Sequence, residues 1–91
     1  MIRLDVANVL GKEYKVTYPK DIGDAVGHVN PYPPAITIWD GLDEYEILST
    51  TLHEVIHALD ELLNLSLSES KVCCLSVGLA DFLTRNGIIK L

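Results

Sequence analysis

Two histidines spaced four residues apart, with a glutamate directly after the first, are the residues in this sequence best suited to chemistry. They lie in the segment His53-Glu54-Val55-Ile56-His57, which reads H-E-x-x-H. On an α-helix, residues four apart share one face, so two imidazoles at this spacing can bind one ion. The glutamate is turned by about 100° around the helix axis, where it can reach a water held by that ion. This combination predicts zinc-assisted hydrolysis of an amide, with His53 and His57 as metal ligands and Glu54 as general base.

The motif lies within a segment of helical periodicity from Glu46 to Leu63, which can start at Asp43 or Gly41 and ends near Asn64. Its apolar residues fill one broad arc of the helical wheel, and the two histidines lie at the edge of that arc. The alternative is a surface helix with two incidental histidines. Two of the three histidines of the chain fall into this one motif, which favours a metal site. The apolar positions are Leu48, Leu52, Val55, Ile56, Leu59, Leu62 and Leu63.

A third metal ligand is expected on a second helix, which the sequence predicts from Leu67 to Arg85. Catalytic zinc sites normally have three protein ligands and one open position. Glu69 and Cys73 lie on a face of this helix that otherwise carries small residues, so the two helices can approach closely. Glu69 is the leading candidate. Cys73 is an alternative, because in an antiparallel hairpin its height is closer to that of His57.

Two acidic residues also have structural interpretations. The segment Ser66-Leu67-Ser68-Glu69 fits a capping box, in which Glu69 would satisfy the start of the helix rather than bind a metal. Asp60 follows His57 by three residues, and it is either a carboxylate that orients an imidazole or an ordinary exposed helix residue. A hydrolytic site also needs a donor for the oxyanion. The candidates for that donor, each of which also has an ordinary structural role, are His28, Tyr32 and Tyr45.

The N-terminal half predicts a small antiparallel sheet of about three strands. Residues Ile2 to Leu10 and Glu13 to Tyr18 have the pattern of a hairpin, with its turn at Gly11-Lys12. Pro19 to Pro34 is rich in glycine and proline and predicts an irregular connection. Ala35 to Trp39 alternates as a third strand directly before the motif helix, so we expect it beside the metal site, where an open edge could bind a peptide by strand addition.

Together these elements predict an α+β fold in which the sheet packs on an antiparallel two-helix hairpin that ends at Asn86-Gly87. The chain has 91 residues, enough for one hydrophobic core but not for two. We therefore expect a single domain over residues 1–91.

Charge and cysteine usage restrict the compartment and the partners. The chain carries seven lysines and arginines against thirteen acidic residues, a net charge of −6, which argues against a nucleic-acid or anionic-membrane surface. No apolar run approaches the ~18 residues of a membrane span, and the N-terminus lacks a signal-peptide pattern, so we expect a cytoplasmic protein. Cys73 and Cys74 are adjacent on one helix and cannot bridge each other without strain, as expected for reduced thiols.

With this order of elements, the chain resembles the minimal zinc metallopeptidases, which are gluzincin-like proteins of phage and prophage type, related in motif to the ImmA/IrrE metallopeptidases. The segment from Thr51 to Asp60 is similar to their active-site helix. Gly11 to Val16 is similar to their early hairpin, Ile36 to Ile38 to their edge strand, and Leu67 to Val72 to the start of their second helix.

This resemblance implies a gluzincin site in which His53, His57 and Glu69 bind Zn²⁺ and Glu54 is the general base. It favours Glu69 over Cys73 as the third ligand. It also makes a regulatory protein conceivable as the substrate.

We therefore expect a zinc metalloendopeptidase whose partner is a protein or peptide substrate. One alternative is a non-catalytic, zinc-stabilised module that acts as a protein-binding regulator of a phage or mobile element. Another is a metal-free α+β domain in which the motif is accidental.

Overall fold

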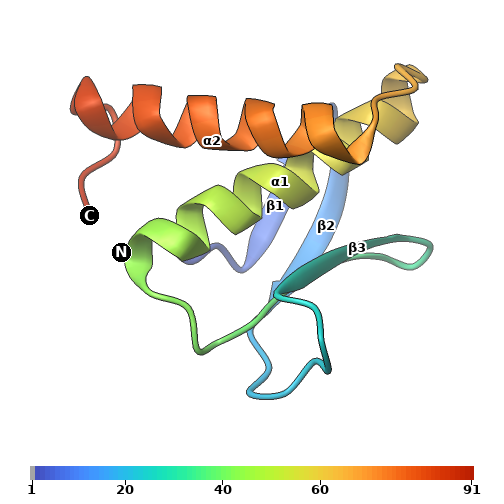
Figure 1. Ribbon diagram of the computed structural model, residues 1–91. Coiled ribbons are helices and arrows are strands. Elements are labelled where there is room, and N and C mark those ends of the chain that lie inside the picture. Colours follow the sequence, from blue (N-terminus) through green and yellow to red (C-terminus); the bar gives the residue numbers. More distant parts are fainter. Residues whose placement is uncertain (1) are drawn as a thin grey trace.

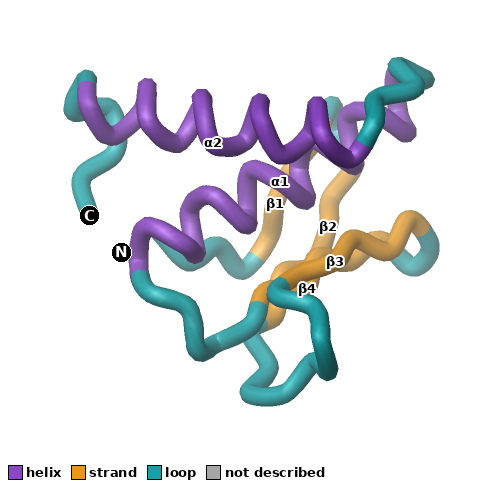
Figure 2. The backbone as a smooth tube through the Cα atoms, viewed as in Figure 1, coloured by secondary structure: helices purple, strands orange, loops and turns teal. Residues whose placement is uncertain are grey.

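The computed structural model describes residues 2–91 and contains one sheet and two helices. The sheet, helix α1 and helix α2 form successive layers, with α1 in the middle (Figures 1 and 2). The predicted α+β class, a sheet packed on a helical hairpin, is confirmed. In chain order the elements are β1 (Val6–Val9), β2 (Lys12–Thr17), β3 (Gly27–Pro31), β4 (Pro34–Ile38), α1 (Glu44–Leu63) and α2 (Glu69–Arg85).

The first two strands form the predicted hairpin, but its turn is shifted by one residue. The backbone φ angle is positive at both Leu10 (52°) and Gly11 (84°), and Val9 pairs with Lys12 across the hairpin. Two consecutive left-handed residues between paired strands are typical of a type I′ turn, whose twist matches that of the strands. The turn therefore lies at Leu10-Gly11 and not at the predicted Gly11-Lys12.

The segment 19–34, which the sequence predicts as irregular, contains the edge strand β3. This strand pairs antiparallel with β4, from Gly27 opposite Ile38 to Pro31 opposite Pro34. Strands β2 and β4 run parallel, so the sheet has the order β1-β2-β4-β3. It is a mixed sheet of four strands, where the sequence predicts an antiparallel sheet of about three. Glycine and proline at the two ends of β3 obscure it in the sequence, because both residues are depleted in strands and proline is tolerated only at sheet edges.

The main hydrophobic core lies between one face of the sheet and α1. Its best-buried large side chains are at most 1% exposed. Burying each such side chain contributes roughly 1.5–3 kcal/mol, so this layer fixes α1 firmly on the sheet. The core residues are Ala7, Val9, Tyr14, Val16, Ile36, Ile38, Ile47 and Ala58.

The ends of α1 are determined by local capping. The Asp43 carboxylate accepts a hydrogen bond from the Glu46 N–H, and the Glu46 carboxylate accepts one from the Asp43 N–H. This reciprocal capping box identifies Asp43, one of the two predicted starts, as the residue that begins the helix. At the other end Asn64 adopts a left-handed conformation with φ of 54°, as expected for the residue that ends a helix.

Helix α2 packs mainly against α1, through a face of small residues. Its buried residues Val72, Ser76 and Ala80 are spaced four apart, so they lie along one side of the helix. The helix begins after the N-cap Ser68, two residues later than predicted, and ends at Arg85 as predicted. In the described part of the chain, neither helix has the length and apolarity that crossing a membrane requires.

Candidate metal centre

Helix α1 presents His53 and His57 side by side toward α2. Their Nε2 atoms are 3.2 Å apart, and their ring centroids are 4.8 Å apart in an edge-to-face arrangement. The four-residue spacing places both rings on one face, and the packing of α1 on the sheet holds that face in place. The two imidazole nitrogens therefore converge on one point, as the sequence predicts.

Glu69 completes the cluster from the first turn of α2. Its Oε1 lies 2.7 Å from His53 Nε2, and its Oε2 lies 3.0 Å from His57 Nε2. The predicted capping box starting at Ser66 is wrong, because the N-cap is Ser68, whose hydroxyl accepts the Lys71 N–H. Glu69 is thus the first residue of the helix, and its carboxylate is free to point at the histidines.

The short turn between the helices brings Glu69 into this position. The Asp60 carboxylate accepts a hydrogen bond from the Leu67 N–H at 3.1 Å, and the Asp60 carbonyl accepts one from the Leu65 N–H at 3.1 Å. Asp60 therefore ties the turn to the end of α1. Among the described residues, no hydrogen bond joins the Asp60 carboxylate to an imidazole, so the structure does not support the alternative in which Asp60 orients a histidine.

Cys73, the alternative third ligand, lies beside the cluster rather than in it. Its Sγ is 3.9 Å from His53 Nδ1 and 3.9 Å from Glu69 Oε1. It therefore faces the ring nitrogen of His53 that points away from His57. The sequence predicts that Cys73 lies closer to the height of His57 along the hairpin, but its sulfur faces His53 instead. The reason is that α2 begins at Glu69, which lies opposite both histidines.

Glu54 lies next to the cluster and is buried, with 5% of its surface exposed. Burial raises the pKa of this carboxyl group, and positive charge on the neighbouring His53 and His57 lowers it by a smaller amount. Strand β3 covers the side chain: a Cβ at Gly27 would lie 3.3 Å from Glu54 Oε2 and 2.8 Å from Thr50 Cγ2. A glycine at position 27 therefore lets the edge strand approach the motif helix closely.

The three candidate oxyanion donors are dispersed. His28 lies on β3, exposed, and its charge contributes to lowering the pKa of Glu54. Tyr32 is 87% exposed in the turn between β3 and β4, and Tyr45 lies in the first turn of α1. Within residues 2–91, none of the three lines the pocket at the cluster.

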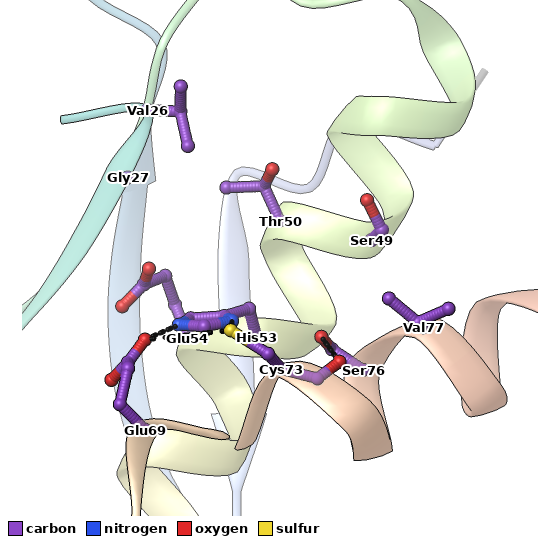
Figure 3. Close-up of a pocket in the computed structure, with 10 residues that line it drawn as sticks. All are labelled: Val26, Gly27, Ser49, Thr50, His53, Glu54, Glu69, Cys73, Ser76 and Val77. Atoms are coloured by element: carbon purple, nitrogen blue, oxygen red, sulfur yellow. Dashed lines mark hydrogen bonds and ion pairs between the residues drawn. The ribbon is translucent and has the colours of Figure 1, made fainter. Parts of the chain in front are cut away.

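A pocket of ≈ 400 Å³ opens beside the cluster, between β3 and the two helices (Figure 3). His53, Glu54 and Glu69 lie at one end of it. Most of the other lining residues are not predicted from the sequence. Helical spacing could have found Ser49 and Thr50, which lie one turn before His53. Val26 and Gly27 are brought in by β3, a strand that was not predicted. The lining residues are Val26, Gly27, Ser49, Thr50, His53, Glu54, Glu69, Cys73, Ser76 and Val77.

His53, His57 and Glu69 together could hold a metal ion. One ligand atom from each lies within 4.8 Å of the other two, and the cluster combines two imidazoles with one carboxylate. Both ligand types bind divalent metals, imidazole favouring transition metals and zinc.

Comparison of the chain with protein-family models, with curated proteins and with solved structures found no match.

Proposed function

We propose that the protein is a zinc-dependent peptidase with a gluzincin-type site, in which His53, His57 and Glu69 are the zinc ligands. The observation that carries the proposal is the convergence of both Nε2 atoms and both Glu69 oxygens on one point. In a tetrahedral site with Zn–N bonds of ~2.05 Å, two ligand nitrogens lie about 3.3 Å apart. The separation of 3.2 Å between the two Nε2 atoms fits that geometry.

The donor set supports a catalytic rather than a purely structural role. Structural zinc sites are closed by four protein ligands, usually including cysteine, whereas catalytic sites leave one position open. Here three side chains converge, and the cluster opens into the pocket. Cys73 is not one of the three converging side chains, and its sulfur faces His53 Nδ1 rather than Nε2.

Zinc bound in this cluster would polarise the scissile carbonyl and lower the pKa of a water toward ~7. Glu54 is the residue that would accept a proton from that water and return it to the leaving amine, because its carboxylate lines the same pocket. In the metal-free protein, burial raises the pKa of Glu54, which makes its carboxylate a stronger acceptor for a proton. We propose protein or peptide segments as the substrates.

The proposal is tested by measuring zinc content and the hydrolysis of unstructured fluorogenic peptides in the same samples of wild type, Glu54→Gln and Glu61→Gln. Glu61 is a matched control, because it is an exposed glutamate on the same helix. We expect about one zinc per chain in all three proteins. Since general acid–base catalysis contributes typically 10²–10⁴-fold, Glu54→Gln should lose at least about 100-fold in rate, and Glu61→Gln should retain the wild-type rate. Unchanged cleavage by Glu54→Gln, or wild type without bound zinc, would contradict the proposal.

A further inference from the structure

The pocket has two chemically different ends. Figure 3 shows Glu69, His53 and Glu54 at one end, with Val26 and Val77 farther along, on either side of the hydroxyl-bearing residues of α1. Both acidic side chains of the pocket are at the cluster end. The far end is lined by Val26, Ser49, Thr50 and Val77, none of which carries a charge.

The walls of the far end are supplied by three different elements. Val26 directly precedes β3, and its carbonyl accepts a hydrogen bond from the Trp39 N–H at 2.8 Å, which fixes it to the end of β4. Val77 projects from α2, one turn beyond Cys73. Thr50 comes from α1 and contacts the Gly27 backbone region closely enough to exclude a side chain there. The far end is therefore built by the tertiary fold and does not depend on a single flexible loop.

The chemistry of this end discriminates between ligand side chains. An aliphatic group placed against Val26 or Val77 buries apolar surface, which is favourable by roughly 25 cal/mol per Å². A carboxylate in the same place would lose hydration without meeting a basic partner, since no lysine or arginine lines the described pocket. It would also lie near the carboxylates of Glu54 and Glu69. An amide side chain would find hydrogen-bond partners there only in the Ser49 and Thr50 hydroxyls, and it would lose hydration where it lies against the valines.

We infer that this end of the pocket receives an uncharged aliphatic substrate side chain next to the scissile bond, and that Val26 and Val77 determine this specificity. The inference rests on the proposed function, because the scissile bond must lie at the cluster. The volume of ≈ 400 Å³ is at the lower end of the range for small-ligand pockets, about 300–1,000 Å³, so it accommodates a single side chain and its neighbouring backbone.

The experiment compares two metal-chelating probes on zinc-loaded protein by isothermal titration calorimetry: the hydroxamate of N-acetyl-leucine and that of N-acetyl-asparagine. The hydroxamate group anchors both probes at the metal, and their side chains have similar size and differ in polarity. We expect wild type to bind the leucine probe at least about 10-fold more tightly, the lower bound for discrimination by an apolar pocket. Equal affinity for the two probes would overturn the inference.

Two near-isosteric variants test whether Val26 and Val77 cause the preference for the leucine probe. Val77→Thr and Val26→Thr change polarity with little change of shape, and both valines are exposed enough that the fold tolerates a hydroxyl. Each variant should reduce the preference for leucine several-fold. The matched control is Leu79→Thr, an exposed position of α2 outside the pocket, which should keep the wild-type preference. Loss of the preference in Leu79→Thr, or its retention in both valine variants, would overturn the assignment.

Peptide cleavage by the same samples separates this inference from the proposed function. Cleavage of leucine- and asparagine-containing peptides at equal rates would overturn the specificity and leave the peptidase proposal standing. A clear preference in probe binding without any cleavage would support the pocket assignment and contradict hydrolysis.

Discussion

The two helices contribute to one candidate metal site, but the rest of the fold holds them very differently. Helix α1 has the sheet on one side and α2 on the other, and Ile47 and Ala58 on its sheet side are at most 1% exposed. Helix α2 packs mainly on α1, and its outer side leaves Leu75, Leu79 and Phe82 43–54% exposed. The two histidines are therefore fixed by the core, whereas Glu69 depends on one helix–helix interface and one short turn.

The largest expected effect is on the sheet side of α1. Ile47→Ala leaves a cavity in the main core and should lower the free energy of unfolding by about 2–5 kcal/mol. Val72→Ala, at the interface of α2 with α1, removes two methyl groups and should cost about 1–3 kcal/mol, at roughly 0.5–1.5 kcal/mol per group. Urea unfolding with a chelator present measures both. A larger loss of unfolding free energy in Val72→Ala than in Ile47→Ala would contradict the contrast drawn between the two helices.

The next-largest loss of stability is expected where β3 closely approaches α1. Gly27→Ala would place a Cβ 2.8 Å from Thr50 Cγ2 and 3.1 Å from the Thr37 carbonyl oxygen, so the strand must shift away from the motif helix. Overpacking of this kind costs typically 1–3 kcal/mol. It should also lower peptide hydrolysis, because Glu54 Oε2 is only 3.3 Å from the added atom. Chemical unfolding and steady-state rates test this prediction, and wild-type stability in Gly27→Ala would refute it.

The burial of Glu54 predicts a pH dependence of stability in the metal-free protein. Its folded-state pKa is raised above the ordinary value of 4.5, chiefly because burial disfavours the charged carboxylate. The folded state therefore binds this proton more tightly than the unfolded state, and the contribution of Glu54 to stability falls as the pH rises above 4.5. Glu54→Gln should be more stable than wild type at pH 8, and this difference should shrink toward zero as the pH falls below 4.5. Unfolding curves of both proteins in chelator, measured from below pH 4.5 to pH 8, test this prediction. A stability difference between Glu54→Gln and wild type that does not change with pH would contradict it.

The smallest effect is expected on the outer side of α2. Gly78 lies inside the helix, and a Cβ added there would meet no atom within 4 Å. Gly78→Ala should therefore stabilise the protein by roughly 0.5–1 kcal/mol, since glycine is a poor helix residue and the substitution causes no clash. Thermal unfolding measures the gain. A loss of stability in Gly78→Ala would mean that this face is not open, and that the contrast between the helices is wrong.

The helices could be predicted from the sequence because their signals are local. Periodicity located both of them, and Asp43 and Asn64 are residue types that cap helices through their own side chains or backbone. Strand β3 and the parallel pairing of β2 with β4 could not be predicted, because both depend on contacts between distant segments. The turn at Leu10-Gly11 was missed because a leucine in a left-handed conformation has no sequence signature.

The candidate site was partly predictable for the same reason. His53, Glu54 and His57 belong to one turn of helix, so their relative placement follows from spacing alone. Spacing did not decide between Glu69 and Cys73, because the answer depends on where α2 begins: the N-cap is Ser68 and not Ser66. The far end of the pocket was not predictable, since Val26 and Val77 are ordinary residues that only the fold brings together.

The proposed metal centre is tested most directly by the zinc content of wild type, Glu69→Ala and Cys73→Ala after purification with excess zinc and removal of unbound metal. The Glu69 side chain is 65% exposed, so its truncation removes the proposed metal ligand without opening the core. We expect about one zinc per chain in wild type and in Cys73→Ala, and a large loss in Glu69→Ala. Wild type without zinc, or retention of zinc by Glu69→Ala together with its loss in Cys73→Ala, would contradict the proposed metal centre.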